Sequence, residues 1–437
     1  MGPLRDGTLA LVNNNALLVV IDHGTDHNAE NHAAAQPMLD ELTQLVRSIG
    51  LQVAGSAVVR LRQPTARLLL GSGKAQQISA QAQQLHADCI VFDDELSATQ
   101  QRNWEQLTGV TVIDRHQVIL DIFQARAATR EATLQVELAR LQYQLPRLTR
   151  AWTHLSRQQG GARGTRGEGE KQLEKDRRTA LRRITRVRSE LQQLGAQRAT
   201  MSRRRHALPV PSGALVGYTN AGKSSLLRAL TGADVLVADK LFATLDPTTR
   251  RLELPGGMQA VLTDTVGFVR KLPHDLVNAF HSTLEETTEA DFLIHVLDAS
   301  DPQMLKHYQT TRSVLQDIGA GETAVLLAFN KMDRVADRDI LRFAHHRFAA
   351  ENVVARVEVS AHAATGLEQL IAAIESLLAS AMPRMRYRLP SNRHDLAALI
   401  HRTGSVLRQE YHEQSFTITA RVPERTHAIL EPFLISG

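Results

Sequence analysis

The stretch GALVGYTNAGKSSLL, residues 213–227, decides the fold of the region around it. Three apolar residues lead into the pattern G-x-x-x-x-G-K-S, and a helical pattern follows. Gly217 and Gly222 allow the backbone to wrap phosphate groups with successive N–H groups, at the positive end of that helix. Lys223 would contact the β and γ phosphates, and the Ser224 hydroxyl would bind Mg²⁺. The stretch predicts a P-loop in an α/β domain.

Two later stretches complete the expected phosphate site. DTVG, residues 264–267, follows an apolar strand pattern. Asp264 is therefore placed to hold Mg²⁺ through a water, and the Gly267 N–H can contact the γ phosphate. Between these motifs, FATLDPTT at 242–249 should sense the γ phosphate, unless it is a simple turn. We expect Thr244 to be the residue on Mg²⁺ and the γ phosphate, with Thr248 and Thr249 as alternatives.

NKMD, residues 330–333, predicts which base is bound. It follows the apolar strand pattern at 325–329, and Ser360-Ala361 follows another at 357–359. The Asp333 carboxylate can accept hydrogen bonds from N1–H and the exocyclic amine of guanine. Adenine lacks these donors and would leave a buried carboxylate unpaired, a mismatch that discriminates by about 10⁴. The order of the motifs, each at a strand end, predicts a guanine-nucleotide site.

The expected site can be stated residue by residue. Nucleotide contacts are expected from Gly217, Tyr218, Thr219, Asn220, Ala221, Gly222, Lys223, Ser224, Ser225, Phe242, Ala243, Thr244, Asp264, Thr265, Val266, Gly267, Asn330, Lys331, Asp333, Ser360 and Ala361. Ser224, Thr244 and Asp264 are the expected Mg²⁺ residues. Lys223, Thr244 and Gly267 should stabilise the transferring phosphate, and no side chain is assigned as an acid or base.

Two positions bear on the rate of hydrolysis. Many GTPases have a Gln after the Gly of the second motif, where it orients the attacking water. This chain has Phe268, whose side chain cannot do so. We therefore expect slow hydrolysis in isolation and acceleration by a partner. Asn220 resembles the position used by cation-dependent GTPases, so K⁺ is a second candidate cofactor. The alternative is an Asn that only stabilises the loop.

The composition is that of a globular protein with several domains. A length of 437 residues favours about three domains, and 43 % hydrophobic residues suffice for ordinary cores. The single cysteine, Cys89, excludes an internal disulfide and a cysteine-based zinc cluster, and it suits a reducing compartment. No apolar run approaches the roughly 20 residues of a membrane helix. We expect a cytoplasmic protein without a membrane span and take it to be monomeric.

Strand and helix patterns alternate before the P-loop as well as after it. Four apolar strand patterns lie between residues 16 and 113, with helical spacing between them, which predicts a mostly parallel sheet. Amphipathic stripes at 130–148 and 170–194 are joined by a glycine-rich segment and predict an antiparallel helical hairpin. After Pro383, short strand and helix patterns predict a small α+β domain.

The fold class we expect is therefore α/β, with four parts. These are an N-terminal α/β domain (1–128) with an antiparallel helical hairpin (129–205), a central P-loop GTPase domain (206–384), and a small C-terminal α+β domain (385–437).

The hairpin is strongly basic. Between Arg126 and Arg205 there are 20 Arg and Lys against 7 Asp and Glu, a net charge of +13, so the rest of the +5 chain carries −8. This suggests a polyanion partner, although a solvated helical face gives the same pattern. Arginines on a glycine-rich loop could reach phosphates that a rigid helix cannot approach, unless the loop is a disordered connector. The candidates for RNA contact are Arg157, Arg163, Arg166 and Lys171.

Beyond these patterns, the chain resembles the HflX family of ribosome-associated GTPases from about residue 16 to the C-terminus. GYTNAGKSSL, LFATLDPTTR, DTVGFVRKLP and NKMD match the family's G domain. LLLGSGKAQQI, VFDDELSATQQRN and GTRGEGEKQLEKDRR are more specific, because no generic GTPase has them. Residues 167–171 read GEGEK where the family usually has GPGET, which adds freedom and charge to the loop.

The resemblance implies a function that the spacing of motifs does not. It implies a Mg²⁺-dependent GTP hydrolase that binds the large (50S) ribosomal subunit and 70S ribosomes. It also implies that the hairpin reaches ribosomal RNA near the peptidyl transferase centre. The expected activity is GTP-dependent splitting or rescue of stalled ribosomes, notably under heat stress. A hydrophobic residue at Phe268 suits this group, which lacks the catalytic Gln.

One N-terminal motif supports an alternative. GSGK, residues 71–74, could cradle a phosphate, and the N-terminal domain of the family is linked to ATP binding and RNA unwinding. The motif is shorter than a P-loop and no Ser or Thr follows Lys74, so a tight turn or a lysine that contacts RNA are the other interpretations. The alternative function is thus ATP-dependent remodelling of ribosomal RNA through the N-terminal domain.

Overall fold

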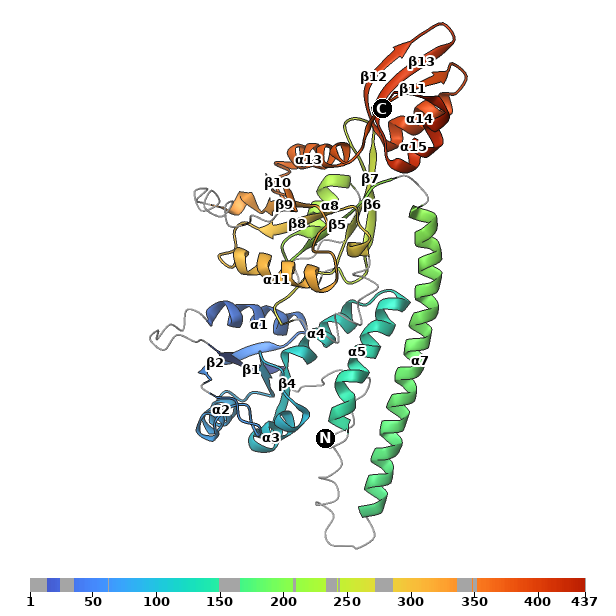
Figure 1. Ribbon diagram of the computed structural model, residues 1–437. Helices are drawn as coiled ribbons and strands as arrows, with labels where there is room; N and C mark the ends of the chain where they lie inside the picture. Colours follow the sequence, from blue (N-terminus) through green and yellow to red (C-terminus); the bar gives the residue numbers. More distant parts are fainter. Residues whose placement is uncertain are drawn as a thin grey trace. The chain divides into compact units, whose positions relative to one another are not determined.

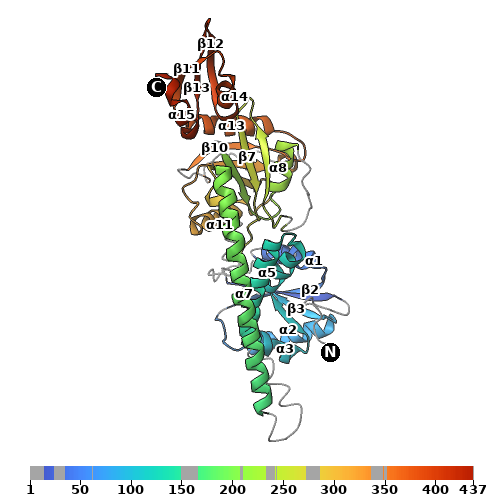
Figure 2. The ribbon, with the colours of Figure 1, turned by 90° about the vertical axis from the view of Figure 1, so that its right-hand side faces the viewer.

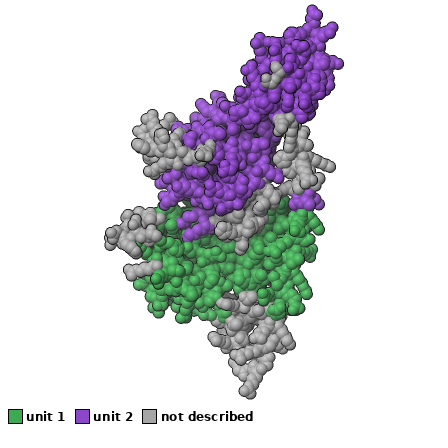
Figure 3. All heavy atoms as spheres, in the orientation of Figure 1, with its two compact units in different colours: residues 1–193, 272–279 green, residues 194–271, 280–437 purple. Residues whose placement is uncertain are grey.

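The computed structural model describes residues 14–23, 35–61, 63–148, 166–206, 210–232, 242, 244–271, 286–335, 348 and 352–436. It divides into two compact units (Figure 3). The first comprises residues 1–193 and 272–279, and the second comprises 194–271 and 280–437. The boundaries between the four parts expected from the sequence remain predictions.

The first unit contains a four-stranded parallel sheet. Its strands lie in the order β2 (Gln52–Arg60), β1 (Asn15–Asp22), β3 (Cys89–Phe92) and β4 (Thr111–Asp114). The helices between and after them are α1 (Gln36–Ser48), α2 (Ser72–Gln84), α3 (Ala98–Thr108) and α4 (Arg115–Arg126). The sequence pattern predicted the strands and α1 closely. It did not predict α4, because apolar residues lie all round that helix and leave no amphipathic stripe.

A helical hairpin follows, as predicted. It consists of α5 (Arg130–Leu148) and α7 (Arg166–His206), and Figure 2 shows α7 as one uninterrupted helix. Glu137 binds Arg183 at 2.6 and 2.8 Å, and Arg130 Nη2 lies 3.3 Å from Glu190 Oε2. Because the earlier residue of α5 pairs with the later residue of α7, the two helices run antiparallel.

The second unit begins with the nucleotide-binding sheet. Its strands lie in the order β10 (Val353–Glu358), β9 (Val325–Asn330), β8 (Phe292–Asp298), β5 (Ser212–Gly217), β7 (Gln259–Asp264) and β6 (Thr248–Glu253). All neighbours are parallel except β6 and β7. Helices α8 (Lys223–Thr231) and α13 (Leu367–Ser380) cover one face, and α11 (Met304–Asp317) covers the other (Figure 1).

The chain ends in a small antiparallel sheet with helices on one side. The strands lie in the order β12 (Ser405–Tyr411), β13 (Ser415–Arg421), β11 (Arg384–Pro390) and β14 (Leu434–Ser436). The helices are α14 (His394–Thr403), α15 (Glu424–Leu430) and the 3-10 turn η4 (Glu431–Phe433). The expected α/β fold with its hairpin and α+β end is thus confirmed. Among the described residues, no helix is both long and apolar enough to cross a membrane.

Candidate nucleotide-binding site

The P-loop joins β5 to α8 through backbone that only small residues tolerate. Gly217 and Gly222 have φ values of 149° and 95°, and Asn220 between them has 60°. A side chain on Gly217 would collide with the carbonyl of Val296, and one on Gly222 would collide with the side-chain amide of Asn330. The sequence therefore needs Gly at both positions to form the turn, and such left-handed turns make anion-binding concavities.

Lys223 begins α8 and is buried beneath this loop. Its Nζ donates to the carbonyls of Gly217 and Tyr218, both at 3.1 Å. Burial lowers the pKa of the Lys223 ammonium to about 8, and the Asp264 carboxylate opposes that shift. Two neutral carbonyls are weaker partners for a cation than phosphate oxygens. The ammonium is thus held where a polyphosphate would stabilise its charge.

Three side-chain oxygens converge in front of Lys223. The Ser224 hydroxyl donates to Asp264 Oδ2 at 2.5 Å, and the Thr244 hydroxyl donates to the same oxygen at 2.8 Å. The two hydroxyl oxygens lie 2.8 Å apart. Asp264 Oδ1 is buried, with no hydrogen-bond partner among the residues that the structure describes. Burial raises the pKa of the Asp264 carboxyl, and the charge of the Lys223 ammonium is the strongest of the influences that lower it. Oxygen donors with an unsatisfied carboxylate atom fit Mg²⁺.

The threonines of the expected γ-phosphate sensor lie in different places. Thr244 belongs to the oxygen cluster described above, whereas Thr248 and Thr249 lie in β6. The Thr249 hydroxyl is 3.1 Å from that of Thr263 on the neighbouring strand. Phe242 is buried with a φ of 54°, and Ala243 lies outside the described residues. Of the three candidates, Thr244 has the contacts that a Mg²⁺ residue requires.

The DTVG segment is tied to the P-loop along its backbone. Thr265 Oγ1 donates to the Leu215 carbonyl at 2.7 Å, and Val266 is buried. A side chain on Gly267 would lie 2.9 Å from Lys223 Nζ. Phe268 pairs with Tyr218: its N–H donates to the Gly217 carbonyl at 3.1 Å, and its carbonyl accepts from the Thr219 N–H at 2.7 Å.

Phe268 and Thr219 are both buried beside the P-loop, and they differ in what their side chains can offer a ligand. The ring is 2 % exposed and lies in the protein interior, so it offers the site only its backbone. Thr219 Oγ1 is buried, and it has no hydrogen-bond partner within the described part of the chain. Ser225 lies in the first turn of α8, and it is half-buried.

NKMD and Ser360-Ala361 form the expected base-binding side of the site. Asn330 Nδ2 donates to the Ala221 carbonyl at 2.9 Å, and its Oδ1 accepts from the Ala361 N–H at 3.0 Å. Asn330 therefore joins the P-loop to the base-binding turn. The Ser360 hydroxyl donates to Asp333 Oδ1 at 2.5 Å and lowers the pKa of that exposed carboxyl. Asp333 is thus charged and oriented at neutral pH.

Three contacts at the site were not foreseen from the sequence. Lys331 Nζ binds Asp298 Oδ2 at 2.7 Å, at the end of β8. The Tyr218 ring stacks on His307 of α11 at 3.8 Å, and its hydroxyl accepts from the Arg270 N–H at 2.7 Å. Asp298 could have been flagged as an acid at the end of a parallel strand, where ligand sites form. No local signal pairs Tyr218 with α11.

GSGK does not adopt the geometry of a P-loop. Gly71 is the N-cap residue of α2 with a φ of −66°, and Ser72, Gly73 and Lys74 form the exposed first turn. The tight turn considered from the sequence is replaced by the plain start of a helix, and phosphate binding at these residues remains a prediction. None of these residues is in the left-handed conformation that shapes residues 217–222.

The basic hairpin departs from the sequence prediction at its loop. Arg157 and Arg163 lie outside the described residues. Arg166 was placed in a flexible loop, which was wrong, because α7 already begins at Arg166, and Lys171 lies in the same helix, within the range 170–194 expected for it.

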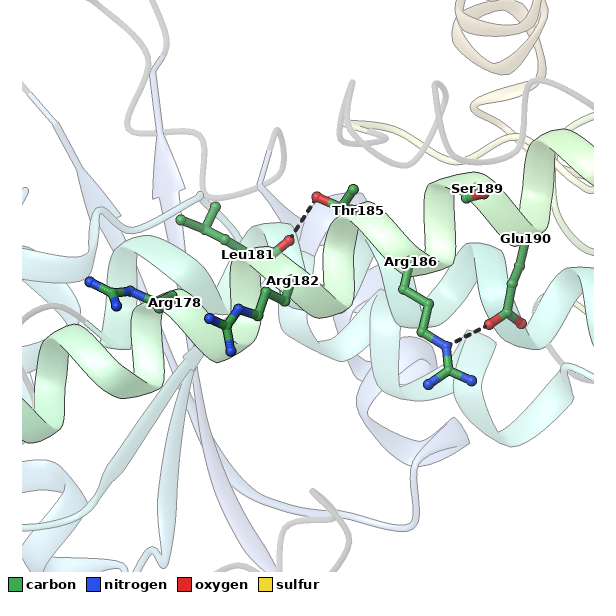
Figure 4. Close-up of a pocket in the computed structure, with 7 residues that line it drawn as sticks. All are labelled: Arg178, Leu181, Arg182, Thr185, Arg186, Ser189 and Glu190. Atoms are coloured by element: carbon green, nitrogen blue, oxygen red, sulfur yellow. Dashed lines mark hydrogen bonds and ion pairs between the residues drawn. The ribbon is translucent and has the colours of Figure 1, made fainter.

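Further along, α7 carries an exposed arginine face, shown in Figure 4. Arg186 Nε donates to Glu190 Oε1 at 3.1 Å. Arg178 lies 3.7 Å from Glu174. Arg182 has no ion pair with any described residue and points away from the helix in Figure 4. The described part of the hairpin therefore presents unneutralised positive charge.

Comparisons with known proteins match family models over three consecutive regions of the chain. The chain matches models described as the GTP-binding GTPase N-terminal region over residues 36–124, the GTP-binding GTPase middle region over 126–205, and a 50S ribosome-binding GTPase over 212–331. A GTP-binding protein from Sulfolobus solfataricus, solved in complex with GDP, is 24% identical with a TM-score of 0.43, over 83% of this chain and 98% of that one.

Relatives with much higher identity span almost the whole chain. GTPase HflX of Akkermansia muciniphila is 48% identical over 407 residues, which cover 91% of this chain and 93% of the relative. GTPase HflX of Escherichia coli (strain K12) is 41% identical over 392 residues, which cover 88% and 89%. The resemblance seen in the sequence is therefore confirmed, and the chain belongs to the HflX family of GTPases.

Proposed function

We propose that the protein is a Mg²⁺-dependent GTP hydrolase that binds the large ribosomal subunit and uses GTP to split stalled ribosomes. The observation that carries the nucleotide chemistry is the convergence of Ser224, Thr244 and Asp264 beside the buried Lys223, with Asp333 held at the base-binding end. The ribosome enters from the family model described as a 50S ribosome-binding GTPase, matched over residues 212–331. We take the protein to act as a monomer in the cytoplasm, notably under heat stress.

The residues divide the work between phosphate and base. Lys223 and the P-loop amides hold the β and γ phosphates, and the Gly267 N–H contacts the γ phosphate. Ser224, Thr244 and Asp264 hold Mg²⁺, which supplies charge neutralisation at the transferring phosphate when bound. Asp333 accepts from guanine. Because Thr244 and Gly267 both contact the γ phosphate, its loss frees two segments and changes the affinity for the ribosome.

Hydrolysis should be slow without a partner. The position after Gly267 holds the buried Phe268, which cannot orient a water. The ribosome would supply or order the missing group. We also propose K⁺ at the P-loop through Asn220, which is exposed and in the left-handed conformation. GTP turnover that is equal in K⁺ and Na⁺ would remove the potassium proposal and leave the rest.

The hairpin is proposed to reach ribosomal RNA through Arg157, Arg163, Arg166 and Lys171, supported by the exposed arginines of α7. Phosphate contacts release counterions, so the affinity for RNA should fall steeply with salt, with a log–log slope of several units. A flat salt response would contradict an electrostatic role of the hairpin.

The decisive experiment measures GTP turnover with and without purified large subunits, and subunit separation of 70S ribosomes by sedimentation. We expect large subunits to stimulate turnover, and 70S ribosomes to separate with GTP. With a Lys223→Ala variant, large subunits should not stimulate GTP turnover and 70S ribosomes should not separate. Unchanged turnover at saturating subunits would instead indicate a nucleotide-sensing scaffold. Remodelling of RNA by Lys223→Ala with ATP would indicate the N-terminal alternative.

A further inference from the structure

The C-terminal sheet has one covered face and one open face. The core of this domain lies between the sheet and its helices: Tyr387, Ile418 and Ala420 pack with Leu396 and Ile400 of α14. In Figure 1, α14 and α15 lie on the same side of the sheet. Side chains alternate between the two faces of a strand, so the intervening residues of β11 and β13 belong to the other face.

Arginines occupy the positions of this open face. On β11 they are Arg384, Arg386 and Arg388, all exposed, in alternation with the buried Tyr387 and Leu389. The ladder pairs Arg386 with Thr419 of β13, and Thr419 with Arg408 of β12. Arg384 pairs with Arg421 of β13. Arginines therefore extend along β11 at intervals of about 6.8 Å and across two neighbouring strands at about 4.8 Å per strand.

The charge of the domain is concentrated on this face. Residues 384–437 contain eight Arg and five Asp and Glu. Five of the arginines lie at open-face positions, with Glu410 as the one acid. The remaining three arginines are outnumbered by four acids elsewhere in the domain. An even mixture of charges is usual for a solvated surface, and this face departs from it.

Most of this positive charge is available to a partner. Glu410 binds Arg386 at 3.2 Å and Arg408 at 2.7 Å, so one carboxylate is shared by two guanidinium groups. The side chains of Arg384 and Arg388 have no hydrogen bond or ion pair with any residue that the structure describes. Arg421 differs, because its Nη1 donates to the Ala379 carbonyl in the last turn of α13 at 2.8 Å.

We propose that this arginine face of the C-terminal sheet, made by Arg384, Arg386, Arg388 and Arg408, binds the phosphate backbone of RNA. Guanidinium groups bind phosphate through paired N–H donors, and Thr419 adds a hydroxyl between two of them. It is a second RNA-binding surface beside the basic hairpin. The proposal needs no bound nucleotide, and it does not depend on ribosome splitting.

The composition of the face favours RNA over an acidic protein. Protein interfaces have an apolar or aromatic centre, whereas the centre of this open face is made by Arg, Thr, Ser and Glu, and its apolar residues are Pro390 at the end of β11 and the exposed Leu407 in the bulge of β12. The same composition lacks the aromatic platforms that stack single-stranded bases. We therefore expect binding to structured RNA through its backbone, with little dependence on sequence.

The test compares two double variants that each remove two positive charges. Arg384→Gln/Arg388→Gln changes the open face. Arg312→Gln/Arg402→Gln changes two exposed helix arginines of the same unit, one on α11 and one on α14, and serves as the matched control. Binding of the full chain to a fluorescent RNA duplex is measured over a range of KCl concentrations.

Each lost phosphate contact should lower the log–log salt slope by about 0.7 to 0.9, so the open-face variant should lose about 1.5 units and bind roughly ten-fold more weakly. The control should keep the slope of the original protein. To prevent the hairpin from masking the effect, both variants are repeated with Arg178→Gln/Arg182→Gln in α7. In that background the other basic residues of the hairpin are retained, and the open-face change should again lower the slope by about 1.5 units.

Equal slopes for the open-face and control variants would overturn the proposal. Binding of poly-glutamate that is lost only in the open-face variant, with RNA binding unchanged, would assign the face to an acidic protein instead. GTP turnover with large subunits is measured on the same samples. Stimulation that persists while the RNA slopes fail to differ would reject the arginine face and leave the proposed function intact.

Discussion

The parallel N-terminal sheet and the mostly parallel nucleotide sheet differ in how the polar groups at the carboxyl ends of their strands are paired. In the N-terminal sheet, Asp93 binds the buried Arg115 at 2.8 Å, and Arg115 also lies 3.0 Å from Glu41. Asp114 accepts from the Tyr143 hydroxyl at 2.9 Å and caps α4. The buried Arg115 charge is therefore paired with two carboxylates of its own domain.

The nucleotide sheet leaves comparable groups unsatisfied. Asp264 Oδ1 and Thr219 Oγ1 are buried with no hydrogen-bond partner in the described ranges, and Lys223 contacts only neutral carbonyls besides the nearby Asp264 charge. An unsatisfied buried polar group costs about 1–3 kcal/mol, so a fold retains it where a ligand will satisfy it. The shared architecture therefore does not decide where a ligand binds. The buried polar atoms without a partner, Asp264 Oδ1 and Thr219 Oγ1, indicate the place.

The largest effect should come from the base-binding end of the nucleotide sheet. In Asp333→Asn, the carboxylate that accepts from guanine becomes an amide. We expect the preference for GTP over xanthosine triphosphate to change by about 10⁴, because the mismatched pair leaves polar groups unsatisfied. Competition binding with GTP, ATP and xanthosine triphosphate measures it.

The matched control is Asp94→Asn, which alters an acid at the carboxyl end of β3 in the N-terminal sheet. That variant should keep the original nucleotide preference. Two results would contradict the difference between the two sheet edges. One is a loss of the preference for GTP in Asp94→Asn as large as that in Asp333→Asn. The other is an unchanged nucleotide preference in Asp333→Asn.

A smaller effect separates the two glycine-lysine motifs. Lys223→Ala should reduce GTP turnover by about 10² to 10³, the usual cost of losing one donor to the transferring group. Lys74→Ala, in the exposed first turn of α2, should leave turnover unchanged. The measurement is single-turnover hydrolysis with large subunits present. A comparable loss in both variants would show that the two motifs act together.

The sequence predicted the parts of this comparison that depend on local patterns. GYTNAGKS, DTVG and NKMD each place a functional group within a few residues of a strand end, and the structure brings those residues together. The C-terminal strands β11 and β13 also follow from simple alternation. Local spacing was sufficient wherever one segment supplies both the backbone and the side chain.

Contacts between distant segments could not be predicted in this way. The pairing of Asp298 with Lys331, and of Tyr218 with His307 and Arg270, depends on how the strands and helices pack. The pairing of Asp93 with Arg115 likewise depends on which strands are neighbours. Whether a carboxylate is satisfied is therefore a tertiary property, so the sequence could not separate the N-terminal edge from the nucleotide edge.

Stability should respond in opposite directions at the two edges. Asp93→Asn leaves the Arg115 charge buried with a weaker partner, which should cost about 3 kcal/mol. Burial raises the pKa of Asp264, so its charged form is disfavoured in the folded protein without ligand. Asp264→Asn should therefore keep or raise the melting temperature while it abolishes Mg²⁺-dependent GTP binding. Calorimetry without nucleotide tests both, and equal destabilisation by the two changes would contradict the comparison.

The smallest effect is a pH dependence that only the nucleotide edge should show. Burial lowers the pKa of Lys223 to about 8, and a bound triphosphate would raise it. Below pH 8 the lysine is protonated in the free and bound protein, so affinity should be flat. Above that pH, binding must take up a proton, and the affinity for GTP should fall up to about ten-fold per pH unit. Titration calorimetry in buffers of different ionisation enthalpy detects this uptake. Lys74→Ala should behave like the original chain, whereas Lys223→Ala should lose both the uptake and the slope. A flat affinity from pH 7 to about 9 in the original protein would mean that Lys223 is already protonated before the nucleotide binds. Burial would then lower the pKa of Lys223 less than the structure indicates.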